Sequence, residues 1–147
     1  MKRPLLLAAS TAVLAAGATG AFLPALASAA PATASISIAV KSDTQHAKKG
    51  SDGKWHDAFL PARFAVHTGQ KVTVTIRNYD HAVHTFTSAR LALNVRIRPG
   101  TLAHPSLTTF TFKAPRAGSY TWQCAGQCDP WAMTHLGYMM GRITVLA

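Results

Sequence analysis

The stretch YTWQCAGQCDPWAMTHLGYMMGRITV, residues 120–145, decides how the chain is predicted to fold. It opens with a short run of alternating polar and apolar residues, and residues 141–147 close the chain with another. Alternation of this kind is typical of half-buried β-strands. Both cysteines of the chain, one histidine and three methionines lie within the stretch. The pattern therefore predicts two neighbouring strands joined by a loop that is rich in soft side chains.

Strand-like segments recur along the rest of the chain. In residues 71–78, Val72, Val74 and Ile76 occupy every second position and are expected to share one buried face. The other strand-like segments are residues 35–40, 84–88, 91–100 and 107–118. Glycine and proline stand at the joints between them, where turns are expected.

No long amphipathic helix interrupts this pattern. Residues 41–54 are polar and predict a solvated loop, and one helical turn fits within residues 129–136. About seven or eight short strands in a chain of this length predict an all-β fold, a Greek-key β-sandwich.

The N-terminus has the pattern of a secretory signal peptide. Lys2 and Arg3 form a positive region, residues 5–23 are apolar, and small residues follow up to a predicted cleavage site after Ala29. A retained membrane anchor is the alternative, although the apolar segment is mostly Ala, Gly and Thr. Residues 1–29 are therefore predicted to direct export to the periplasm, the cell envelope or the extracellular space.

The charge of the remaining chain limits its partners. Without its first 29 residues the chain keeps 13 Lys and Arg against five Asp and no Glu, a net charge of +8. The basic residues are scattered and form no basic helix, so nucleic-acid binding is not predicted. An anionic envelope or a protein partner with an acidic surface fits this charge, and solubility alone is the alternative explanation.

The loop carries the side chains that hold copper in electron carriers, where thiolate and imidazole bind strongly and a thioether binds weakly. Cys124, Cys128, His135 and Met139 come from the loop, with Met140 as the alternative thioether. Outside the cytosol two thiols tend to form a disulfide, but a disulfide alone explains neither the histidine nor the methionines.

The quoted segments resemble the cupredoxin family. VTVTIRNYDHAVHTF, residues 72–86, is similar to the cupredoxin strand and connection that lead to the first histidine ligand. The pattern SYTWQC…H…M-x-G-x-I-T-V is similar to the ligand loop and last strand, and the likeness extends over residues 59–145. The resemblance implies that His84, rather than its neighbour His81, is the first histidine ligand and that Asn78 supports it.

The two cysteines also resemble the dinuclear copper A loop of cytochrome oxidase subunit II and nitrous oxide reductase. That resemblance implies that Cys124 and Cys128 bridge two coppers and that the backbone carbonyl of Gly126 is a further ligand. The likeness then fails, because six residues separate Cys128 from His135 and three separate His135 from Met139. One copper on one cysteine, and a disulfide without metal, remain open.

These resemblances imply a single domain over residues 30–147. Residues 30–57 are expected to form an N-terminal strand and polar loop, and residues 58–147 the core copper-binding part. The implied function is one-electron transfer through one or two copper ions held by the metal ligands His84, Cys124, Cys128, His135 and Met139.

A periplasmic or extracellular copper carrier or chaperone without a redox role is the alternative. The predicted partner is a redox protein or copper acceptor, with no stable membrane insertion and a monomeric state. An enzyme is not predicted, because the chain lacks the His-x-His pairs of multicopper oxidases and has few acid–base groups.

The remaining aromatic residues and histidines are not predicted to bind metal. Trp122, Trp131 and Tyr138 are expected to wrap the site in apolar surface. The histidines at positions 46, 56, 67 and 104 stand alone and are expected to be ordinary surface or core residues.

Overall fold

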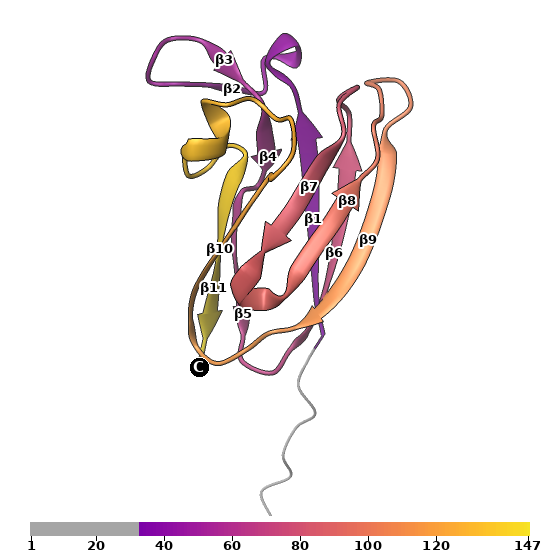
Figure 1. Cartoon of the computed structure of the whole chain (residues 1–147). Coiled ribbons are helices and arrows are strands. Elements are labelled where there is room, and N and C mark those ends of the chain that lie inside the picture. Colours follow the sequence, from indigo (N-terminus) through magenta and orange to yellow (C-terminus); the bar gives the residue numbers. More distant parts are fainter. Residues whose placement is uncertain (1–32) are drawn as a thin grey trace, which may run out of the picture.

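The computed structural model describes residues 33–147, so the predicted signal peptide lies outside the described residues. Strands dominate this part of the chain (Figure 1). The elements in chain order are β1 (Ala34–Lys41), η1 (Asp43–Gln45), β2 (Lys48–Lys49), β3 (Trp55–His56), β4 (Ala58–Leu60), β5 (Arg63–His67), β6 (Lys71–Asn78), β7 (His84–Ser88), η2 (Ala89–Leu91), β8 (Leu93–Ile97), β9 (Ser106–Lys113), β10 (Gly118–Gln123), η3 (Ala132–Thr134) and β11 (Met140–Leu146).

Two sheets form the layers of the sandwich. The first has the strand order β4-β1-β6-β9 and the second has the order β5-β11-β10-β7-β8. The chain crosses between these sheets after β4, β5, β6, β8 and β9, so most neighbours within a sheet are not neighbours in sequence. This connectivity confirms the predicted β-sandwich.

A third, two-stranded sheet pairs β2 with β3. Its first strand lies in the segment predicted to be a solvated loop, so that prediction was incomplete. The hairpin sits at one end of the sandwich, beside the turn that contains η3 (Figure 1). Its position matters because that turn belongs to the loop with the candidate ligands.

The core follows the alternation seen in the sequence. Val72, Val74 and Ile76 on β6 are fully buried, and they face residues such as Phe86 and Ile143 of the opposite sheet. The core aromatics also pack on one another, since Phe86 and Trp122 stack with ring centroids 4.2 Å apart. Burial of such side chains contributes most of the stability of a small sandwich.

The ligand loop leaves the sandwich from the β10–β11 pair. These strands are antiparallel, with Gln123 opposite Met140 and Trp122 opposite Gly141. A β-carbon at Gly141 would overlap the six-membered ring of Trp122 and the carbonyl oxygen of Ala62. Glycine therefore lets the indole lie directly over β11.

We expect Gly141→Ala to lower the free energy of unfolding by about 3 kcal/mol, because overpacking at this point must displace Trp122 or the backbone of Ala62. Urea denaturation would measure the change. Gly126→Ala is the matched control, since a β-carbon there meets nothing within 4 Å. Equal stability of the two variants would contradict the packing argument.

Candidate metal centre

Three candidate ligands converge at the loop end of the sandwich. His84 is the first residue of β7, and its Nδ1 lies 3.8 Å from Sγ of Cys124 and 3.5 Å from Sγ of Cys128. The donor atoms of the three residues all lie within 4.8 Å of one another, and all three residues are buried. Side chains far apart in sequence thus form one cluster of soft donors.

A carboxylate orients His84 toward the sulfurs. Nε2 of His84 lies 2.8 Å from Oδ2 of Asp80. A carboxylate only accepts hydrogen bonds, so Nε2 carries the proton and Nδ1 presents its lone pair to the cysteines. Carboxylate–histidine pairs of this kind fix the ring of a metal ligand and make it more basic.

Asn78 holds the turn that positions this carboxylate. Its Oδ1 accepts the N–H of Asp80 at 2.9 Å, and its Nδ2 donates to the carbonyls of Ala82 and Arg98 at 3.0 and 2.9 Å. The side chain is fully buried. The predicted supporting role of Asn78 is therefore confirmed.

A second carboxyl group lies behind the same histidine. One oxygen of Asp57 is within 4.8 Å of the donor atoms of Asp80 and His84. Burial raises the pKa of Asp57, the N–H of Asp43 opposes this effect, and the nearby Asp80 adds to it. Crowding of acidic groups therefore disfavours a further negative charge beside His84.

The cysteines are joined in a disulfide, with their Cα atoms 6.5 Å apart. The Cys124 N–H donates to the carbonyl of Met139 at 2.8 Å, and its Sγ receives the N–H of Thr85 at 3.4 Å. Two-electron reduction of this disulfide would release two thiolates that already face His84. The backbone contacts hold one of these sulfurs at the end of β10.

The candidate methionines differ in burial. Met139 is fully buried, and its N–H donates to the carbonyl of Ala132 at 3.1 Å. Met140 begins β11 and is only half-buried. Met139 is therefore the methionine enclosed within the site end of the core.

His135 stands apart from the cluster. Its ring stacks on Trp131 with centroids 3.5 Å apart and an interplanar angle of 6°. Its Nδ1 lies 2.6 Å from the carbonyl oxygen of Trp131, so Nδ1 carries the proton and Nε2 keeps a free lone pair. Within residues 33–147, His135 does not join the group formed by His84, Cys124 and Cys128, and its role as a ligand stays a prediction. His81, the alternative to His84 as the first histidine ligand, is exposed.

Aromatic side chains enclose the centre, as predicted for Trp122, whereas Trp131 stacks on His135 and His56. Phe59 packs edge-on against His84 and against Trp122, with centroids 6.2 and 4.9 Å apart. Phe59 and Trp122 are almost completely buried. An apolar wall of this kind excludes water from a metal site.

His56 at the end of β3 is a second buried histidine, and its pairing with two aspartates was not predicted from the sequence. Its Nδ1 lies 2.7 Å from Oδ2 of Asp129, and its Nε2 lies 3.0 Å from Oδ1 of Asp52. Its ring stacks on Trp131 with centroids 3.9 Å apart. The only sequence signal is the spacing of Asp52 and His56 by four residues, which does not reveal that Asp129 completes the group.

Burial, backbone N–H groups and the pairing of His56 with the two aspartates together shift the pKa values of this group. Burial lowers the pKa of His56, but the hydrogen bonds to Asp129 and Asp52 outweigh it, so the pKa is raised above its ordinary value of 6.5. Burial opposes ionisation of Asp129, yet the Ala132 N–H and His56 lower its pKa. The Lys54 N–H lowers the pKa of Asp52, and His56 adds to this effect. The two carboxylates therefore favour the protonated form of the His56 imidazole.

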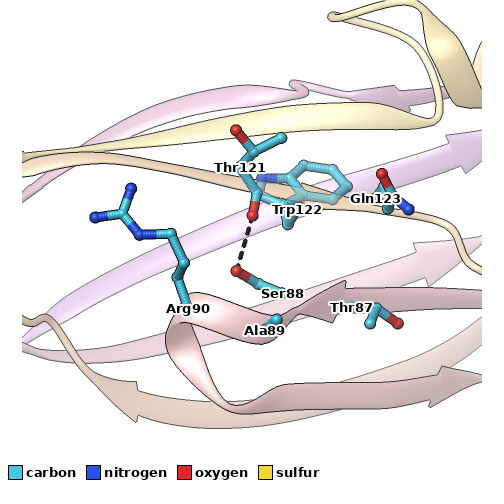
Figure 2. A pocket seen from close by; sticks show the side chains of 7 residues that line it. All are labelled: Thr87, Ser88, Ala89, Arg90, Thr121, Trp122 and Gln123. Carbon is cyan, nitrogen blue, oxygen red and sulfur yellow. Dashed lines mark hydrogen bonds between the residues drawn. The ribbon is translucent and has the colours of Figure 1, made fainter.

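A cavity of about 330 Å³ lies elsewhere, between β7 and β10 (Figure 2). Figure 2 shows Ser88 and Thr121 joined across this gap, where the Ser88 hydroxyl donates to the Thr121 carbonyl at 2.8 Å. Arg90 and Trp122 also line the cavity, and the indole N–H of Trp122 has no hydrogen-bond partner. Because its lining contains no Cys, His or carboxylate, it is not the metal centre.

The donor set fits copper. His84 presents a free imidazole nitrogen, the cysteines supply soft sulfur, and Met139 brings a thioether to the same end of the core. Zinc and copper both accept sulfur and nitrogen, but a buried methionine beside them is characteristic of copper centres.

Comparisons with known proteins identify the class. A family model of the cupredoxin-like domain matches residues 7–144. The chain therefore belongs to the cupredoxin-like family. The family and the grouping of His84, Cys124, Cys128 and Met139 identify copper as its metal.

Solved structures share the fold at low sequence identity. Reduced auracyanin from Roseiflexus castenholzii is 21% identical with a TM-score of 0.50, over 79% of this chain and 99% of that one. Blue copper oxidase from Nitrosomonas europaea is 19% identical with a TM-score of 0.59, over 77% of this chain and 38% of that one. A heme-copper terminal oxidase dimer is 23% identical with a TM-score of 0.45, over 58% and 52%.

The chain thus covers about half or less of two of these three proteins. At these identities the likeness establishes the sandwich fold alone. No curated protein sequence matches the chain. Among residues 33–147, no helix is long and apolar enough to span a bilayer.

We expect Asp80→Asn to weaken copper binding by about tenfold to a hundredfold, as removal of such supporting groups commonly does. The amide can donate to Nε2 of His84, which would move the ring proton to the nitrogen that faces the sulfurs. Competition with a Cu(I) chelator would measure the affinity of the reduced protein. Asp43→Asn makes the same charge change at an exposed residue and should bind copper like the wild type.

The Asp52–His56–Asp129 group predicts a pH dependence of stability. The pKa of His56 is raised in the folded protein. Its contribution to the free energy of unfolding is therefore complete below pH 6.5, and it is lost as the pH rises through this folded-state pKa. The pKa values of Asp52 and Asp129 are lowered, so their contribution to the free energy of unfolding is complete above pH 3.8 and is lost at lower pH.

The metal-free protein should therefore lose more stability between about pH 5.5 and about pH 9 than a His56→Phe variant does. Urea denaturation at both pH values would test this difference. An equal change in the free energy of unfolding for the two proteins would show that His56 does not titrate as inferred.

Proposed function

We propose that the chain is an exported one-electron carrier with a copper centre built from His84, Cys124, Cys128, His135 and Met139. One observation carries the proposal: the free Nδ1 of His84 faces both cysteine sulfurs, while Asp80 holds its other nitrogen. This donor set matches the thiolate, imidazole and thioether chemistry of copper electron-transfer sites.

The sandwich supplies the rigidity that electron transfer needs. Bound copper provides a one-electron couple between Cu(I) and Cu(II). His84 stands at the start of β7, Cys124 directly follows β10, and Met139 directly precedes β11. Strand pairing and the buried core limit movement of these side chains, and Phe59 and Trp122 exclude water. Little rearrangement is then needed when the charge of the site changes.

His135 offers a route for electrons to leave the site. It is half-buried, whereas His84 is fully buried, so its side of the loop lies nearer to solvent. The net charge of +8 on residues 30–147 favours a redox partner with an acidic surface. Either one or two coppers could use the pair of sulfurs.

A copper carrier is the second candidate. Cys124 and Cys128 form a disulfide that can be reduced to two adjacent thiols, and such a pair could take up and release Cu(I). This alternative needs the same ligands but no electron exchange.

The full chain, expressed for export, should bind copper only after reduction of its disulfide. We expect copper analysis to give one or two ions per chain, with a thiolate-to-copper absorption band and electron exchange with a small redox dye. An unpaired electron shared over two ions in electron paramagnetic resonance would establish bridging cysteines. A single-ion spectrum would establish one copper.

Paired variants make the test specific. Replacing both Cys124 and Cys128 by Ala should abolish binding, whereas His67→Ala, an exposed control, should not. Reduced protein that takes up no copper would reject both functions. Copper-loaded protein that delivers its ion to an acceptor but exchanges no electrons would reject the electron carrier and leave the copper carrier.

A further inference from the structure

The β2–β3 hairpin packs directly on the loop that carries His135 (Figure 1). Nζ of Lys48 donates to the carbonyl of Gly137 at 2.7 Å and lies 4.1 Å from the ring centroid of Tyr138. The Tyr138 hydroxyl donates to the carbonyl of Lys49 at 2.8 Å. These contacts join residues about 89 positions apart and attach the hairpin to the loop after His135.

His56 attaches the same hairpin to the loop before His135. It is buried, its two nitrogens bond Asp129 and Asp52, and its ring lies nearly parallel to Trp131 at an angle of 15°. A protonated imidazole over an indole face adds a cation–π attraction to this stack. His56 therefore contacts the loop through both its bond to Asp129 and its ring face.

Asp129 passes this restraint into the backbone of the loop. While its Oδ2 bonds His56, its Oδ1 accepts the N–H groups of Trp131 and Ala132 at 2.9 and 3.1 Å. The carbonyl of Trp131 in turn accepts Nδ1–H of His135 at 2.6 Å. This series of hydrogen bonds connects His56 to His135 through Asp129 and the backbone of Trp131.

The rings form a second, parallel connection. Trp131 lies between His56 and His135, with centroid distances of 3.9 and 3.5 Å. A β-carbon at Gly50 would lie 2.6 Å from Oδ1 of Asp52, 2.7 Å from Cδ2 of His56 and 2.9 Å from Cη2 of Trp131. The hairpin thus approaches the stack as closely as a residue without a side chain allows.

We propose that His56, held by Asp52 and Asp129, is a positioning residue that fixes Trp131 and thereby the ring of His135. The bonds leave Nε2 of His135 as the nitrogen available to a metal. Six residues separate Cys128 from His135, and the hairpin restrains this connection through the bond from His56 to Asp129. Restraining the connection lowers the conformational entropy that the loop loses when His135 joins the other ligands.

The inference rests on the proposed function only for the role of His135 as a ligand. The ring arrangement itself belongs to the metal-free protein and can be tested there. The two parts can therefore fail separately.

The first experiment compares the full-length wild type with His56→Phe in the metal-free state. Phenylalanine keeps an aromatic ring beside Trp131 but removes both bonds to the carboxylates. Nuclear magnetic resonance should detect close contacts between the rings of Trp131 and His135 in the wild type, and these should weaken or vanish in the variant. Unchanged ring contacts would overturn the proposal.

The second experiment measures copper affinity and the electron paramagnetic resonance spectrum after reduction. We expect His56→Phe to bind copper about tenfold to a hundredfold more weakly, with an altered spectrum. His46→Phe is the matched control, because this exposed histidine contacts Trp55 and should leave both properties unchanged. Lost stability with unchanged affinity and spectrum would make His56 a purely structural residue.

Gly50→Ala provides an independent variant if His56→Phe does not fold. It retains every charged group, but its β-carbon would lie too close to Asp52, His56 and Trp131, so this cluster must shift. We expect the same loss of ring contacts and a weaker copper affinity. A wild type that has the ring contacts but takes up no copper would reject the proposed function while leaving the positioning of His135 intact.

Discussion

The pairing of β10 with β11 is the constraint on which the rest of the centre depends. It sets Trp122 opposite Gly141 and continues beyond the strands as the bond from the Cys124 N–H to the Met139 carbonyl. One backbone ladder therefore places Cys124 and the buried Met139 side by side. The indole that lies over Gly141 joins this ladder to the aromatic core, so the ligand positions depend on core packing as well as on the loop.

The acidic residues show how a basic protein uses its few negative charges. Four of its five aspartates lie around two buried histidines at the loop end of the sandwich. Asp80 bonds His84 with Asp57 close by, and Asp52 and Asp129 bond His56. These aspartates gather at the loop end, so the remaining surface is dominated by the scattered Lys and Arg residues.

The two histidine groups act on different parts of the centre. Asp80 sets the proton position of the His84 ring, and Asn78 holds the turn that carries this carboxylate. His56 instead bonds a loop, where Asp129 and Trp131 lead to His135. His84 is held on a strand, whereas the loop that carries His135 is also bonded to the hairpin through its backbone and Asp129.

The sequence by itself determined the strands and most of the donor set. Period-two alternation predicted β6 and β7 with the bounds that they have in the structure, because a half-buried strand must alternate. The resemblance to cupredoxins selected His84 over the exposed His81, and the helical turn near Ala132 was predicted within its segment. These features depend on residues that are close in sequence.

Only the tertiary structure decided the surroundings of the loop. Lys48 and Lys49 are polar and appeared to be solvated, yet they form a strand that contacts the far end of the chain. His56 appeared to be an isolated histidine, because its partner Asp129 lies 73 positions away. The local hydrophobic pattern predicts which face of a strand is buried, but it does not predict which distant charged residue that face contacts. Long-range pairing of this kind is specified by the folded chain as a whole.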